Sequence, residues 1–164
     1  MEIRTARSDE IEVVLDVLAD AAAWLRERGI DQWPERFDRD WVMPAIERGE
    51  TWLAESDGDV AGSLVVQWED PMFWEGYPLD AGYLHRLAVR RPGTGLGARL
   101  LHWAEAHAAA AGKLFLRLDC VAGNEPLRRY YERAGYRRVG DVTVGPYVQA
   151  RYEKRVELMA EPGA

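Results

Sequence analysis

A strand, a glycine-rich turn and a helix follow one another without a break between residues 81 and 112. The mainly apolar stretch Tyr83–Val89 predicts a strand, and the turn Arg90–Gly97 leads directly into a helix that ends at Gly112. The first amides of a helix have no partners within it, and glycines let a ligand approach the backbone closely. The helix dipole also favours negative charge there, so the segment predicts a site for a phosphate group.

Composition limits the classes of protein and of partner that fit this chain. Its 164 residues carry a formal net charge of −7, which argues against nucleic acid as a partner. No run approaches the ~20 apolar residues that span a bilayer, so no membrane association is expected. The single cysteine and the absence of a leader pattern predict a cytoplasmic protein. We expect one domain over residues 1–155, with a flexible tail over 156–164.

The other elements predict an α/β fold with a mixed sheet of about 6–7 strands and about 4 helices. Before the glycine turn, the patterns predict a strand at 2–6, a helix that Ser8 caps and Gly29 ends, a helix at 39–47, and a hairpin of strands 51–55 and 60–68. After it, they predict a strand at 114–121, a helix between Asn124 and Gly135, and strands near 136–142 and 147–155. The helix between them makes the strands on either side of the glycine turn parallel.

Two other phosphate-binding motifs can be compared with the glycine turn. It lacks the Gly-Lys-Ser/Thr ending of a nucleotide-triphosphatase P-loop. Gly93, Gly95 and Ala98 do fit the dinucleotide pattern G-x-G-x-x-A, and Asp119 lies near the end of the next strand. A dinucleotide fold needs further βα units, whereas only one helix is predicted after Cys120. An NAD(P)-binding oxidoreductase is therefore the less favoured alternative.

Two motifs in this order resemble those of the GNAT superfamily of acetyl-CoA-dependent N-acetyltransferases, over about residues 2–155. The first, LAVRRPGTGLGARLL, is similar to the family's strand-turn-helix pattern Q/R-x-x-G-x-G/A. The second, NEPLRRYYERAGYRRVG, is similar to its Asn and following helix, which ends Tyr-x-x-x-Gly-aromatic. Aligning Gly95 and Gly97 with the family glycines places Pro92 where Gln or Arg is usual. This departure affects one side-chain contact and leaves the backbone amides in place.

The resemblance implies a GNAT-like fold whose parallel strand pair is splayed, with acetyl-CoA as acyl donor and no metal. The pantetheine arm would bond to backbone groups of the central strand much as an added strand would. The pyrophosphate would bind the amides of the glycine turn. The cofactor-binding residues implied are Leu87, Ala88, Val89, Gly93, Thr94, Gly95, Leu96, Gly97, Ala98, Asn124 and Tyr131.

The resemblance also implies that Tyr131 lies near the thioester sulfur and protonates the leaving thiolate. His85 is the candidate general base, because histidines titrate near neutral pH and alternation points it to the same face as Leu87. Packing of Tyr131 in the core, and His85 as a half-buried polar residue of the strand, are the alternatives. Weaker candidates for the base are Glu69, Asp70 and Asp119. Cys120 is interpreted as an inert strand residue.

The acceptor is expected to be an amine of a small molecule or peptide that attacks directly in a ternary complex. Its predicted binding residues are Trp24, Trp33, Phe73, Trp74 and Tyr77. The last three belong to the loop 69–80, which could wall an amine pocket, form a homodimer contact or cap the core. A CoA-binding module without turnover is the alternative from another functional class. No residue identifies the acceptor itself.

Overall fold

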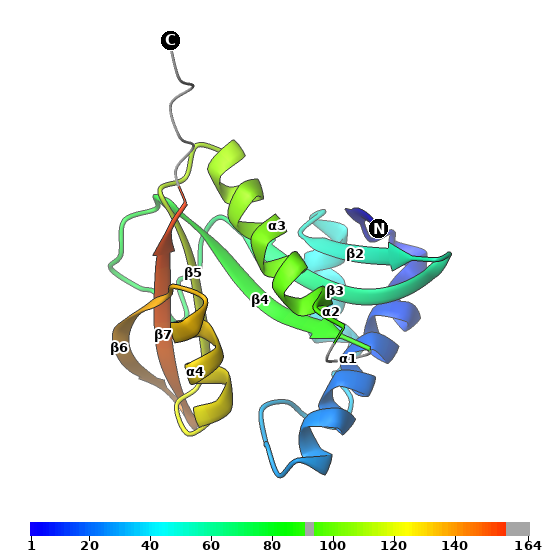
Figure 1. The fold of residues 1–164 in the computed structure, drawn as a ribbon, viewed down its shortest axis with the longest axis horizontal. Helices are drawn as coiled ribbons and strands as arrows, with labels where there is room; N and C mark the ends of the chain where they lie inside the picture. The colour runs from blue at the N-terminus through cyan, green and yellow to red at the C-terminus, as the bar shows by residue number, and fades with distance from the viewer. Residues whose placement is uncertain (91–93, 157–164) are drawn as a thin grey trace. The chain divides into compact units, whose positions relative to one another are not determined.

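The computed structural model of the chain describes residues 1–90 and 94–156 (Figure 1). Within these ranges seven strands form one mixed sheet in the order β1-β2-β3-β4-β5-β7-β6. The strands are β1 (Glu2–Thr5), β2 (Thr51–Ser56), β3 (Asp59–Gln67), β4 (Ala81–Val89), β5 (Phe115–Val121), β6 (Arg137–Val144) and β7 (Tyr147–Arg155). The helices are α1 (Ile11–Glu27), α2 (Arg39–Glu47), α3 (Leu96–Ala110) and α4 (Glu125–Arg133), with a 3-10 turn at Ser8–Glu10. The predicted fold class is confirmed.

The chain divides into two compact units, each with its own contacts. One unit comprises Met1–Val66 with His85–Leu101, and the other comprises Gln67–Leu84 with the described part of His102–Ala164. Residues 157–164, which make up most of the expected tail, lie outside the described residues. None of the described helices is long and apolar enough to cross a membrane.

The core of the first unit lies between helices and the β2–β3 hairpin. The buried stripe of α1 includes Val14, Leu15 and Leu18, and it packs with residues of α2, β2 and β4. In Figure 1, α1 and α2 pass behind β3. A Cβ at Gly62 of β3 would lie 2.9 Å from the Leu100 side chain, so glycine is what allows the start of α3 to approach the strand this closely.

The second unit is built on a parallel pair and two antiparallel pairs of strands. The parallel ladder runs from Ala81↔Phe115 to Leu84↔Leu118, as the intervening helix predicted. β4 begins two residues before the predicted start at Tyr83, and it continues to Val89 beyond this ladder. β7 pairs with β5 on one side and β6 on the other. A second core cluster contains Trp74, Ala81 and Tyr83.

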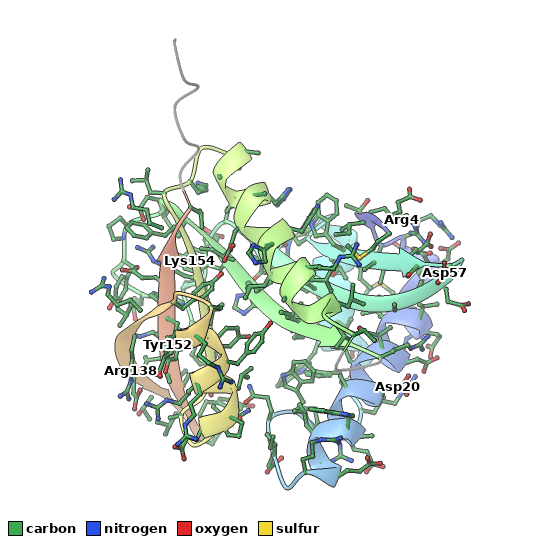
Figure 2. The ribbon with its side chains drawn as sticks, in the orientation of Figure 1. Arg4, Asp20, Asp57, Arg138, Tyr152 and Lys154 are labelled. Atoms are coloured by element: carbon green, nitrogen blue, oxygen red, sulfur yellow. The ribbon has the colours of Figure 1, made fainter. Side chains whose placement is uncertain are left out.

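The entry to α1 differs from the prediction that Ser8 caps the helix. A 3-10 turn precedes α1, and the Arg7 N–H donates to the Glu10 carboxylate at 2.8 Å. The same carboxylate accepts two hydrogen bonds from Arg4, at 2.9 and 2.7 Å, which the local pattern around Ser8 does not reveal. Arg4, labelled in Figure 2, also pairs with Glu55 of β2 at 2.6 Å. Glu10 therefore joins the start of α1 to the edge of the sheet.

We expect Glu10→Gln to destabilise the protein at neutral pH and to have little effect near pH 2. Hydrogen bonds from Arg4 lower the pKa of Glu10 from 4.5 to about 2. The folded pKa lies below the unfolded one, so the stabilisation is present above about pH 4.5 and is lost as the pH falls through about 2. This shift corresponds to about 3 kcal/mol at pH 7. Urea unfolding at both pH values measures it.

The exposed residue Glu12, replaced by glutamine, is the matched control for this change. Its ion pairs with Arg36 and Arg39 lie at the surface, so its loss should cost well under 1 kcal/mol at either pH. Equal destabilisation by Glu10→Gln at pH 7 and pH 2 would contradict the ion-pair explanation.

Candidate functional site

The end of β4 is held in place immediately before the glycine turn. The backbone N–H of Arg90 donates to the Ala61 carbonyl at 2.9 Å, and its guanidinium pairs with Asp20 of α1 at 3.0 Å. The side chain of Arg90 is thus already engaged within its own unit. Gly93 and Pro92, on which the sequence made predictions, lie outside the described residues.

The start of α3 presents backbone donors without a Cβ in their way. Gly95 has a φ of 79°, and beyond its chain neighbours no described residue lies within 4 Å of where its Cβ would be. Its carbonyl accepts the first described intrahelical bond, from the Arg99 N–H at 3.2 Å. The preceding amides, those of Leu96, Gly97 and Ala98, are first-turn groups that an α-helix does not satisfy internally. Thr94, Gly95 and Ala98 are exposed, so this end of the helix fits the pyrophosphate of CoA.

The middle of β4 departs from a regular strand. Arg86 has a φ of 50°, in the left-handed region that residues other than glycine seldom adopt. Strict alternation therefore fails between His85 and Leu87, and the argument that placed both side chains on one face does not hold. His85 is half-buried, and its role as base stays a prediction. Ala88 belongs to the first core, while Leu87 and Val89 are half-buried.

Tyr131 lies in a cluster of four tyrosines in the second unit. Its ring contacts those of Tyr130, Tyr136 and Tyr152, with centroids 5.6–6.3 Å apart. The Tyr136 hydroxyl donates to Glu105, and the Tyr152 hydroxyl, on β7 in Figure 2, accepts from Arg128. Among the described residues the Tyr131 hydroxyl has no hydrogen-bond partner, so it remains available to a ligand. Burial raises the pKa of Tyr131 and keeps it protonated.

Two further predictions concern the turn that follows β5. The side chain of Asn124 accepts from the Leu127 N–H at 3.3 Å, which confirms it as the N-cap of α4. Asn124 is also buried, and its contact with the pantetheine stays a prediction. Burial raises the pKa of Cys120 to about 12. Its thiol is therefore protonated at neutral pH, which argues against a nucleophilic role.

Cationic side chains hold the aromatic loop 69–80 at its backbone. The Phe73 carbonyl accepts from Arg151 at 3.2 Å, and the Pro78 carbonyl accepts from Arg117 at 2.8 Å. Both guanidiniums also lie over the ring of Trp74, 5.4 Å from its centroid. Only 2% of Trp74 is exposed, because it packs in the second core. For Trp74 the geometry favours the interpretation that the loop caps this core.

Phe73 and Tyr77 pack more loosely against the same core and are half-buried. The ring of Tyr77 lies edge-on to Trp74 with centroids 5.0 Å apart. Both rings keep part of their surface in solvent. Roles in acceptor binding for all three loop aromatics stay predictions.

The remaining predicted acceptor residues lie in the first unit. Trp24 has one ring face covered by the Arg28 guanidinium, 3.7 Å from its centroid. Trp33 is half-buried and meets Phe37 edge-on at 5.9 Å. Phe37 in turn lies under the guanidinium of Arg86, a residue that the sequence did not single out. The available signal was an arginine next to His85 in a mainly apolar strand.

Comparisons with known proteins agree with the two motifs and the fold. The sequence model of the acetyltransferase (GNAT) family matches residues 18–136. The protein described as uncharacterized N-acetyltransferase YesJ of Bacillus subtilis is 32% identical over 158 residues, covering 90% of this chain and 86% of that protein. A GNAT-family acetyltransferase structure from Listeria monocytogenes aligns with a TM-score of 0.79 and 32% identity over 94% of each chain.

A further structure, yncA of Salmonella typhimurium, contains its cofactor acetyl-CoA. It aligns with a TM-score of 0.68 over 100% of this chain and 98% of that one, at 18% identity. At this identity the likeness concerns the fold alone. It extends over the whole of this chain and nearly all of the other.

Proposed function

Because the chain belongs to the GNAT family of acetyltransferases, which use acetyl-CoA, we propose that it transfers the acetyl group to the nitrogen of an amine carried by a small molecule or peptide. The observation that carries this proposal is the start of α3, where Gly95, at positive φ, precedes three first-turn amides. The N-acetyltransferase description of YesJ supports nitrogen as the acceptor atom. The buried thiol of Cys120 agrees with a reducing, cytoplasmic setting as part of the same proposal.

Acetyl-CoA supplies a thioester whose carbonyl an amine can attack. The amides of Leu96, Gly97 and Ala98 would hold the pyrophosphate, since they are unsatisfied donors at the positive end of a helix dipole. A backbone N–H near Leu87 would stabilise negative charge on the carbonyl oxygen. Each of these groups belongs to the backbone, so the side chains around them remain free to pack.

Two side chains would move protons. His85 would accept the proton that the acceptor's ammonium group must lose before its nitrogen can attack, and Tyr131 would donate one to the departing thiolate. Burial keeps the Tyr131 phenol protonated across the neutral range, which a proton donor requires. In each turnover the amine nitrogen gains the acetyl group, CoA leaves as the thiol, and one proton is released to solvent.

Measurements of cofactor binding and of turnover distinguish this proposal from a CoA-binding module and from an oxidoreductase. Isothermal titration with acetyl-CoA and with NAD should show binding of acetyl-CoA alone, at submillimolar concentration or tighter. Thiol release should then follow when amines, amino acids and peptides are added. Binding of acetyl-CoA without thiol release over a broad panel would indicate a CoA-binding module, and binding of NAD alone would support the oxidoreductase.

We expect His85→Gln to replace the acidic limb of the wild-type pH–rate profile by one that follows the pKa of the free amine. Glutamine keeps the size and a hydrogen-bonding side chain but cannot accept a proton, so kcat/KM should fall about 100-fold at neutral pH. The rate of the variant should recover as rising pH deprotonates the amine in solution. Thiol release measured between pH 6 and 10 tests this. A variant whose acidic limb lies at the same pH as that of the wild type would exclude His85 as the base.

A further inference from the structure

Arg86, in the first unit, has an energetically unfavourable backbone conformation. Its φ of 50° interrupts the extended course of β4, and such outliers in ordinary residues concentrate at functional sites. Local breaks in strand geometry also re-aim side chains next to active sites. Arg86 is moreover the residue between His85, the candidate base, and Leu87, whose backbone is the candidate oxyanion donor. The strained residue therefore lies between two residues to which the proposed reaction assigns roles.

The guanidinium of Arg86 contacts an aromatic ring and a carbonyl group and forms no ion pair with a described carboxylate. It lies 5.9 Å from the centre of the Phe37 ring, and its Nη1 donates to the Trp41 carbonyl at 3.2 Å. The Nε atom is buried and has no hydrogen-bond partner. Glu50, the nearby carboxylate, makes its ion pair with Arg48 instead. Among the described residues no carboxylate forms an ion pair with Arg86.

A half-buried cation without an anion is unfavourable unless a ligand supplies the charge. Burial, together with the charge of Arg48, lowers the pKa of Arg86 from its ordinary value, yet an arginine stays protonated at neutral pH. Arg117, which is more deeply buried, binds both Asp80 and Glu153. Arg86 has no such partner among the described residues, and its buried Nε lacks the hydrogen bond that the Arg117 Nε donates to Glu153.

The surroundings of Arg86 match the predicted acceptor side of the first unit. Trp33, a predicted acceptor residue, meets Phe37 edge-on, and Phe37 carries the guanidinium on its face. Trp41, whose carbonyl binds Arg86, is 64% exposed. A charged group at the end of a row of aromatic rings suits a ligand that has both an apolar body and an anionic end.

We propose that Arg86 binds a carboxylate of the acceptor, so that the substrate is an amine that also carries a carboxylate group. The inference rests on the proposed amine acetylation and names the class of its acceptor. A guanidinium forms strong charge-assisted hydrogen bonds with a carboxylate, and it binds a neutral carboxamide of the same shape far less well. The acetylated product would keep its carboxylate, because only the amine reacts.

Matched pairs of amines test the proposal. The acceptors are β-alanine, 4-aminobutyrate and glycylglycine, each compared with its carboxamide. The wild-type protein should acetylate the carboxylates of at least one pair with a kcat/KM 10- to 100-fold higher than the carboxamide. Arg86→Gln should abolish this preference by raising KM for the carboxylate while leaving the carboxamide within about threefold. Arg86→Lys should retain part of it, because it keeps the charge and loses the planar fork.

A binding measurement tests, independently of turnover, whether Arg86 binds a carboxylate. With CoA at saturation, the Nε–H resonance of Arg86, assigned by its loss in Arg86→Lys, should shift on addition of a carboxylate acceptor and not of its carboxamide. If no amine is acetylated but the resonance responds selectively, the proposed function fails while carboxylate binding stands. If carboxamides bind and react as well as carboxylates, or Arg86→Gln weakens both members of every pair alike, Arg86 has a structural role and the proposal is wrong.

Discussion

Tyr131→Phe is expected to lower kcat for acetyl transfer about 100-fold, while the affinity for acetyl-CoA stays within about threefold. The substitution removes one hydroxyl and keeps a ring that packs against three other tyrosines. Because that hydroxyl bonds no described residue, its loss should cost little stability. General acid catalysis typically contributes a factor of 10²–10⁴, so the loss should appear in turnover. Steady-state thiol release and calorimetric binding of acetyl-CoA measure the two quantities.

Tyr130→Phe is the matched control, because it makes the same chemical change at the adjacent, half-buried residue. It should leave kcat within about twofold. An acyl donor with a better leaving group provides a second comparison. S-phenyl thioacetate releases thiophenolate, which needs less protonation than the thiolate of CoA. The Tyr131→Phe substitution should therefore reduce the rate much less with this donor than with acetyl-CoA. An equal loss with both donors would place Tyr131 in binding or packing instead of proton donation.

The sequence was sufficient to predict the order and type of the secondary-structure elements. Each long element has an apolar periodicity that is local, and glycine or asparagine marks its end, as Asn124 and Gly135 do for α4. The parallel pairing of β4 and β5 also followed, since a helical crossover allows little else. The family resemblance rested on these local patterns. It was confirmed by the match to residues 18–136 and by the relatives that share 32% identity.

Features that depend on distant partners could not be predicted in this way. Ser8 has the preferred residue type for a cap, but the Glu10 carboxylate accepts the Arg7 N–H. Arg4 holds that carboxylate and also pairs with Glu55 of β2. Trp74 was expected near a ligand because its loop is rich in aromatics. Its burial depends on Arg117, which is distant from it in the sequence. Arg117 lies over the Trp74 ring and binds the backbone of the same loop. In both cases the local sequence allows more than one structure, and an ion pair or a cation–π contact with a residue distant in the sequence determines which one forms.

The conformation of Arg86 is the clearest case of information that the local sequence lacks. Positive φ is normally signalled by glycine or asparagine, and arginine gives no such signal. The regular alternation assumed for His85 and Leu87 failed for this reason. The same observation drew attention to Arg86, whose missing counter-ion appears only when its neighbours in space are known.

Ala98→Asp is expected to weaken acetyl-CoA binding by 30- to 100-fold without destabilising the fold. Ala98 is exposed in the first turn of α3, so a carboxylate there would lie within a few ångströms of a bound pyrophosphate. Repulsion at an effective dielectric constant near 20 amounts to about 2–3 kcal/mol. The same carboxylate interacts favourably with the helix dipole, by about 0.5 kcal/mol. Cofactor affinity and thermal stability should therefore move in opposite directions, which calorimetric titration and thermal unfolding measure.

Two control variants are needed. One tests whether the shape of the new side chain weakens binding, and the other tests whether an added negative charge elsewhere on α3 does so. Ala98→Asn has nearly the same shape as Ala98→Asp and no charge, so it should keep acetyl-CoA affinity within about threefold. Ala106→Asp adds the same charge to an exposed position of α3, eight residues or about 12 Å further along the helix, where screening reduces the repulsion. Weak binding by all three variants would indicate a general disturbance of α3. Unchanged binding by Ala98→Asp would mean that the pyrophosphate does not bind at the start of this helix, and the site proposed there would be wrong.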